Sequence, residues 1–160
     1  MIEHDDMLAA LAGLLEGETD PVANAANTAA LVASSVPRLN WVGFYFLRGA
    51  ELVLGPFHGQ PACTRIAIGR GVCGTAFARG ETIVVPDVHA FEGHIACDSA
   101  SRSEIVVPFR TGGGLAGVLD IDSPEPDRFS AADRVLFEAV AAAYAASCCL
   151  PLDAVLSAGS

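Results

Sequence analysis

The sequence predicts an α+β domain with a central antiparallel β-sheet that is flanked by helices from both ends of the chain. Three observations support this fold class: apolar residues recur at helical spacing before Pro37, short aromatic and β-branched segments with glycine turns fill the middle, and an alanine-rich helical segment follows Ser130. Strands joined by tight turns, with helices grouped at the two ends, are typical of an antiparallel sheet.

Two helices are expected before the first strand. Leucines recur at helical spacing up to Leu15, and Gly17 then ends the first helix. Asp20 and Pro21 follow as a capping acid and a proline at the first helical position, and the second helix ends at Pro37. Its alanine-rich face would let another helix approach closely.

The middle of the chain predicts strands with one short helix between them. The aromatic segment 40–48 and the segment 51–58 form a hairpin around Gly49-Ala50. The other expected elements are a short strand at 64–68, a helix starting near Val72, a strand at 82–86, a long loop at 87–102, strands at 104–110 and 115–121, and a final helix with a capping box of Ser130 and Asp133. A loop of this length is usually functional or disordered.

Composition limits the classes of function. A chain of 160 residues, 52% hydrophobic and 18% charged, suits one globular domain over residues 1–160, with 151–160 outside its core. The net charge of −10 repels phosphate groups, so we expect neither nucleic acid nor an anionic membrane as a partner. The acidic N-terminus does not read as a signal peptide, and no apolar run is long enough to span a bilayer, so the expected location is cytoplasmic.

Cysteines and carboxylates gather in the stretch between residues 63 and 122. The residues concerned are Cys63, Cys73, Cys97, Glu104, Asp120 and Asp122. Asp120 and Asp122 are two apart on one strand and therefore share a face, where their repulsion raises at least one pKa and keeps a proton available near neutral pH. In a reducing compartment, an odd number of cysteines indicates buried apolar residues, metal ligands or redox thiols.

The cysteines and histidines could also have purely structural roles. Cys97 lies in a polar loop, which favours catalysis, whereas Cys148 and Cys149 lie on an alanine-rich helix and are expected to pack as apolar residues. Zinc bound by the first three cysteines is disfavoured because no close C-x-x-C pair is present. The loop histidines are expected at the surface: His58, His89 and His94.

Alternatives also remain for the strand residues. Asp120 and Asp122 could form an exposed strand face, although Asp120 follows apolar residues in mid-strand. Trp41 and Tyr45 are an even number of residues apart and share a face, where they could be ordinary core residues.

Six segments together resemble a known family. They are N-W-V-G-F-Y, G-R-G-V-C-G-T-A, V-P-D-V, C-D, S-E-I-V-V-P and G-V-L-D-I-D-S. In this order they resemble a GAF domain and, more narrowly, the free methionine-(R)-sulfoxide reductases, over about residues 3–150. The three cysteines make the resemblance specific, because an ordinary GAF domain has no reason to keep them. It implies a GAF fold with the active site on a sheet face, covered by the loop at 87–102.

The resemblance also implies roles for individual residues. Cys97 would be the nucleophile, Cys63 the resolving cysteine, and Cys73 a substitute or second relay. The implied substrate pocket consists of Trp41, Tyr45, Glu104, Asp120 and Asp122. No metal or other cofactor is implied, and the reductant would be a thioredoxin-type dithiol.

The implied reaction is the reduction of free L-methionine-(R)-sulfoxide to L-methionine, a defence against oxidative stress. Cys97 would attack the sulfoxide sulfur and become a sulfenic acid, which condenses with Cys63 to an intramolecular disulfide that thioredoxin reduces. The carboxylates would protonate the oxygen, while the aromatic residues would hold the S-methyl group. The rival hypothesis is a non-enzymatic GAF sensory module that binds a small molecule. We also expect a homodimer formed through the alanine-rich helices.

Overall fold

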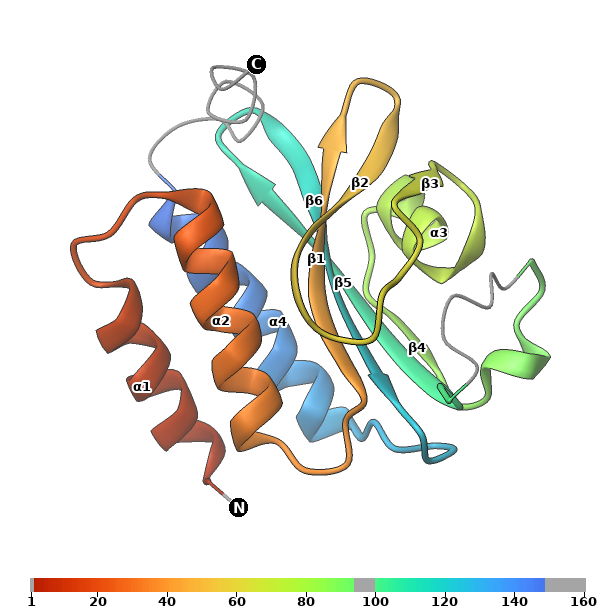
Figure 1. Cartoon of the computed structure of the whole chain (residues 1–160), viewed down its shortest axis with the longest axis horizontal. Helices are drawn as coiled ribbons and strands as arrows, with labels where there is room; N and C mark the ends of the chain where they lie inside the picture. The colour runs from red at the N-terminus through yellow and green to blue at the C-terminus, as the bar shows by residue number, and fades with distance from the viewer. Residues whose placement is uncertain (1, 94–99, 149–160) are drawn as a thin grey trace.

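The computed structural model describes residues 2–93 and 100–148 (Figure 1). The helices are α1 (His4–Leu15), α2 (Pro21–Ser35), α3 (Gly71–Arg79) and α4 (Ala131–Ser147), with a short 3₁₀ helix η1 (Val88–Ala90). The strands are β1 (Trp41–Arg48), β2 (Glu51–Gly59), β3 (Arg65–Ala67), β4 (Ile83–Val85), β5 (Ser103–Thr111) and β6 (Gly114–Ser123).

The strands form one six-stranded sheet in the order β3-β2-β1-β6-β5-β4, and all neighbouring strands are antiparallel. Helices α1, α2 and α4 cover one face, and α3 lies over the other (Figure 1). The predicted α+β class with a flanked antiparallel sheet is therefore confirmed. Each face carries its own apolar cluster, so the sheet is buried on both sides.

Both predicted helix caps are present. The Asp20 carboxylate accepts hydrogen bonds from the backbone N–H groups of Val22 and Ala23, at 2.9 and 2.8 Å, which starts α2. Ser130 and Asp133 form the reciprocal capping box that starts α4. Arg128 adds a buried ion pair to Asp133, with 3.0 Å between the nitrogen and the oxygen.

The face under α1, α2 and α4 has an aromatic core. The rings of Phe44 and Tyr144 have their centroids 4.5 Å apart, and Phe109 meets the Tyr144 ring edge-on at 5.4 Å. The Tyr144 hydroxyl donates a 2.9 Å hydrogen bond to the carbonyl oxygen of Pro21, which ties α4 to the start of α2. This face therefore holds the N- and C-terminal helices together.

The loop expected at 87–102 contains one regular turn. Residues Val88–Ala90 form η1, which begins where the Asp87 carboxylate accepts a 3.0 Å hydrogen bond from the N–H of His89. The expected loop was therefore wrong for residues 88–90. A capping aspartate can start a single helical turn even where apolar residues do not recur at helical spacing. Residues 94–99 of the predicted lid lie outside the described residues.

Within residues 2–93 and 100–148, the structure has no helix that combines the length and apolarity needed to cross a membrane.

Candidate active site

The three predicted carboxylates lie on the sheet face that α3 covers. Side chains alternate along a strand, so Ile105 and Ile121 belong to the core under the other helices, whereas their neighbours Glu104, Asp120 and Asp122 point the opposite way. Asp122 in β6 pairs directly with Glu104 in β5. All three carboxylates are 6–7% exposed, which rules out the alternative of a solvated strand face.

Helix α3 brings a thiol to these carboxylates. Cys73 lies in the first turn of α3, as predicted, and is buried. Gly74 allows the approach, because a side chain there would collide with the carbonyl oxygen of Ala67 at the end of β3. The Cys73 Sγ and one oxygen each of Glu104 and Asp120 all lie within 4.8 Å of one another. We call these three side chains the thiol–carboxylate cluster.

Burial changes the protonation of this cluster. It raises the pKa of Glu104 well above its usual range, and the charges of Asp120 and Asp122 raise it further. Burial also raises the pKa of Asp120 to about 6, although hydrogen bonds from Glu104 and Cys73 oppose that shift. The pKa of the Cys73 thiol is raised by burial and then by Asp120. The cluster therefore keeps protons near neutral pH, as expected for carboxylates at close range.

Three stacked aromatic side chains, Trp41, Tyr45 and Phe57, lie beside the carboxylates, and we call them the aromatic wall. Trp41 pairs with Asp122 across β1 and β6, and its ring stacks on Phe57 at 5.3 Å and on Tyr45 at 6.0 Å. A side chain at Gly43 would come within 2.5 Å of the Trp41 ring, so the glycine makes room for it. The prediction that Trp41 and Tyr45 share a face is confirmed, and both are buried.

Sequence reasoning missed Phe57 as a member of this wall. Phe57 lies on β2 directly opposite Gly43, and its side chain is 36% exposed. Counting back from the predicted turn at Gly49-Ala50 places Gly43 opposite Pro56. The register shift between Gly43 and Tyr45 brings Phe57 there instead, so no pattern in the sequence signalled it.

Tyr45 connects the wall to a second cysteine. Its hydroxyl donates a 2.9 Å hydrogen bond to the backbone carbonyl of Cys63, and burial raises the pKa of Tyr45, so the group stays a donor. Cys63 is disulfide-bonded, and neither Cys73 nor Cys148 is its partner, because neither forms a disulfide. A disulfide-bonded Cys63 offers no thiolate to zinc. The predicted nucleophile, Cys97, lies outside the described residues.

The remaining sequence predictions concern residues away from this face. His58 and His89 are exposed, as expected, and His94 lies outside the described residues. Cys148 is half-buried and packs against the core under α1, α2 and α4, which confirms its packing role. Cys149 also lies outside the described residues.

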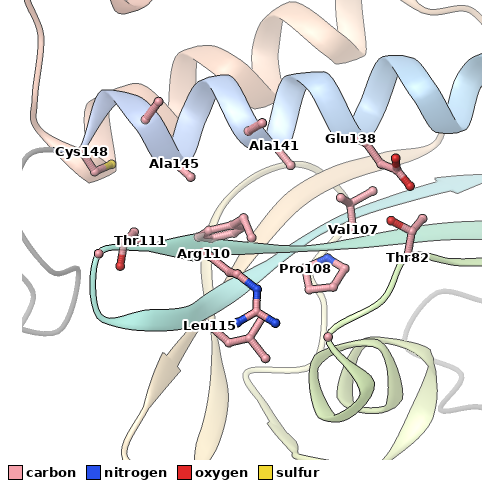
Figure 2. Close-up of a pocket in the computed structure, with 15 residues that line it drawn as sticks. Thr82, Val107, Pro108, Arg110, Thr111, Leu115, Glu138, Ala141, Ala145 and Cys148 are labelled. Carbon is pink, nitrogen blue, oxygen red and sulfur yellow. The ribbon is translucent and has the colours of Figure 1, made fainter.

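A cavity of about 610 Å³ lies elsewhere, between α4 and β5 (Figure 2). The lining residues along α4 include small side chains such as Ala141 and Ala145. Glu138 stands at one end of this row, Cys148, just past α4, at the other, and Thr111 lines the cavity from β5. Among the described residues, none of the predicted catalytic or substrate-binding side chains lines this cavity. It is therefore separate from the candidate site.

Comparisons with known proteins agree with this architecture. The family model described as "GAF domain" matches residues 20–148. The free methionine-R-sulfoxide reductase of Escherichia coli strain K12 is 53% identical over 121 residues, which cover 76% of this chain and 73% of that protein. The protein of the same name from Saccharomyces cerevisiae is 40% identical over 152 residues, covering 90% and 84%.

A solved structure is similar over nearly the whole chain. It is the X-ray structure of free methionine-R-sulfoxide reductase from Neisseria meningitidis in complex with its substrate. The two chains are 42% identical and superpose with a TM-score of 0.87, covering 98% of this chain and 92% of the other.

Proposed function

Because this chain belongs to the GAF domain family and, within it, to the free methionine-R-sulfoxide reductases, we propose that it reduces free L-methionine-(R)-sulfoxide to L-methionine. The observation that carries the proposal is the buried group of Glu104, Asp120 and Asp122 beside an aromatic wall, in which burial raises the pKa of Glu104 so that it keeps its proton. Reduction of a sulfoxide needs both a proton for the departing oxygen and an apolar seat for the S-methyl group.

The carboxylates supply the proton. Glu104 is the strongest candidate acid, because burial and two neighbouring charges raise its pKa the most clearly. Once Glu104 has given its proton to the sulfoxide oxygen, the sulfur becomes a better electrophile. Glu104 then carries the negative charge, and Asp120 and Asp122 hold the oxygen in place by accepting hydrogen bonds from the new S–OH group.

The thiols supply two electrons. In the proposed sequence, the Cys97 thiolate attacks the protonated sulfoxide and an S–S bond forms. The oxygen is then transferred to the Cys97 sulfur as the S–O and S–S bonds to methionine break, which leaves a sulfenic acid on Cys97 and releases methionine. The Cys63 thiol then attacks this sulfur, releasing water and forming a disulfide that a thioredoxin-type dithiol reduces. The disulfide-bonded state of Cys63 and the anchoring of its carbonyl by Tyr45 support the resolving role.

Cys73 has a different environment from a reactive thiol. Burial and the nearby Asp120 raise the pKa of its thiol, and a thiol is a much weaker nucleophile than a thiolate. The relay role predicted for Cys73 stays a prediction; its Sγ lies within 4.8 Å of an oxygen of Asp120. The aromatic wall would seat the S-methyl group through sulfur–aromatic contact worth about 0.3–1.5 kcal/mol.

The test is turnover of the two epimers of free methionine sulfoxide by the purified protein. With dithiothreitol as reductant, we expect consumption of the R epimer only, lost in Cys97→Ser and kept in the matched control Cys148→Ser. Replacing dithiothreitol by thioredoxin and its reductase tests the proposed reductant. Turnover of neither epimer would contradict the proposal and favour a GAF module that only binds a small molecule.

We further propose that the chain forms a homodimer through its helical side. Exposed apolar residues occur on three of those helices: Leu14 on α1, Val22 on α2 and Val135 on α4. Sedimentation equilibrium should give twice the mass of one chain, and a mass of one chain refutes this proposal. The cytoplasmic location stays a prediction.

A further inference from the structure

The thiol–carboxylate cluster has the composition of a metal site. Cys73 comes from α3, Glu104 from β5 and Asp120 from β6, so three rigid elements position one donor each. We propose that this cluster binds a divalent cation of the zinc type, with the Cys73 Sγ and one oxygen each of Glu104 and Asp120 as ligands. Three protein ligands would leave a fourth position for water or substrate, as in open zinc sites.

The geometry needs only small side-chain adjustments. The three donor atoms lie within 4.8 Å of one another. Ligands about 2.0–2.3 Å from a tetrahedral zinc ion lie about 3.5 Å apart, so each donor must move by roughly an ångström or less.

An unsatisfied atom points independently to a ligand. Asp120 is 6% exposed, and its Oδ1 has no hydrogen-bond partner among the residues that the structure describes. A buried carboxylate oxygen without a donor is costly, and a cation would remove that cost. Exposed acidic clusters lack this feature, because water satisfies their oxygens.

The donor set selects among cations. One sulfur and two carboxylate oxygens suit Zn²⁺ or Co²⁺, whereas Mg²⁺ and Ca²⁺ prefer six or more oxygen ligands. No electrons move when the metal binds. The Cys73 thiol and any protonated carboxylic acid ligand release their protons to solvent, and the dipositive ion replaces them, which leaves the three ligands and the ion with a net charge of −1.

Metal binding has a consequence for catalysis that rests on the proposed function. Glu104 and Asp120 cannot coordinate a cation and also protonate a sulfoxide oxygen. Zinc should therefore inhibit reduction reversibly, and a chelator should restore it. The binding itself does not depend on any enzymatic activity.

The experiment uses Co²⁺ as a spectroscopic probe of the reduced, full-length protein. We expect one equivalent of Co²⁺ to produce a thiolate-to-cobalt charge-transfer absorption, which Zn²⁺ displaces and excess Mg²⁺ does not. The absorption should be lost in Cys73→Ser and unchanged in Cys148→Ser, the other described cysteine outside a disulfide. Asp120→Asn should weaken binding by at least about tenfold, since even outer-shell partners of metal ligands contribute that much.

Circular dichroism of each variant shows whether it is folded, so that loss of binding is not confused with loss of structure. Charge-transfer absorption that persists in folded Cys73→Ser overturns the proposal, as does the absence of Co²⁺ binding at millimolar concentration. Turnover of methionine sulfoxide in a protein that binds no Co²⁺ refutes the metal site alone. Conversely, Co²⁺ binding in a protein without turnover refutes the proposed function alone.

Discussion

The two faces of the sheet are built from the same strands but have opposite chemistry. On β5 and β6, Ile105 and Ile121 enter the apolar core under α1, α2 and α4, while Glu104 and Asp122 point to the α3 side. The first face is aromatic and aliphatic throughout its core. The second places buried carboxylates, a thiol and stacked rings together.

This difference separates stability from chemistry within one sheet. Burying Phe44 or Ile105 contributes hydrophobic free energy, whereas burying three carboxylates consumes part of it. The larger helix-covered core can stabilise strands that carry such a costly cluster on their other side. We therefore expect substitutions on the two faces to affect different measurements.

The largest expected effect is on turnover, from Glu104→Gln. The variant keeps the shape of the side chain but loses its proton, so the rate with free methionine-(R)-sulfoxide should fall by about 10²–10⁴-fold, the usual contribution of a general acid. The matched control is Glu51→Gln, an exposed strand carboxylate paired with Arg65 at 2.6 Å. If the Glu104→Gln variant turned over within a factor of two of the wild-type rate, Glu104 would not be the general acid of the reaction.

The next effect is on stability, from Phe44→Ala on the helix-covered face. Phe44 is fully buried against Tyr144, so its removal should lower the free energy of unfolding by about 3–5 kcal/mol in a urea titration. Phe57→Ala on the other face serves as the comparison, because that ring is 36% exposed. Equal losses from the two substitutions would show that the faces do not divide their roles in this way.

Asp120→Asn tests the energetic cost of the buried cluster. The pKa of Asp120 is raised from 3.8 to about 6 by folding, so between these values the folded state binds more protons and stability falls as pH rises. Above pH 6 the ionised Asp120 lowers the free energy of unfolding by on the order of 2–3 kcal/mol, and the neutral amide of the variant should restore this stability. Urea titrations at pH 5 and pH 8 measure it: the variant should gain stability relative to wild type at both pH values, with a gain at pH 8 roughly twice that at pH 5. A gain that is equal at both pH values would contradict the raised pKa.

The smallest effect is expected from Ser130→Ala at the cap of α4. The serine hydroxyl accepts a 3.1 Å hydrogen bond from the N–H of Asp133, and its loss should cost about 1 kcal/mol of unfolding free energy. Turnover per folded molecule should not change, because α4 covers the other face. Ser34→Ala, near the end of α2, is the control and should cost much less. A fall in turnover without a fall in stability would link α4 directly to the site.

Local patterns in the sequence were sufficient for the elements and for part of the site. Alternation along a strand predicted that Asp120 and Asp122 share a face and that Trp41 and Tyr45 do so as well. The capping aspartate and proline predicted the start of α2 to the residue. These features depend on residues close together in the chain.

The rest depended on register between strands, which local patterns do not determine. The pairing of Glu104 with Asp122 follows a β5–β6 hairpin whose register shifts near Phe109, and the β1–β2 register shifts after Gly43. The shift after Gly43 brings Phe57 opposite Gly43 and so beside Trp41, and Phe57 was missed for this reason. The burial of Cys73 depends on how closely α3 approaches the sheet, and this too is a property of the whole fold.

The central claim is that free methionine-(R)-sulfoxide binds on the α3 side of the sheet. The chain has a single tryptophan, Trp41, and it stands in the wall beside Asp122. The most direct measurement is its fluorescence in Cys97→Ser, which should bind the substrate without consuming it. We predict a saturable change in emission with the free R epimer, and none with the same residue inside a peptide. Unchanged emission, together with no heat of binding by calorimetry, would contradict the account.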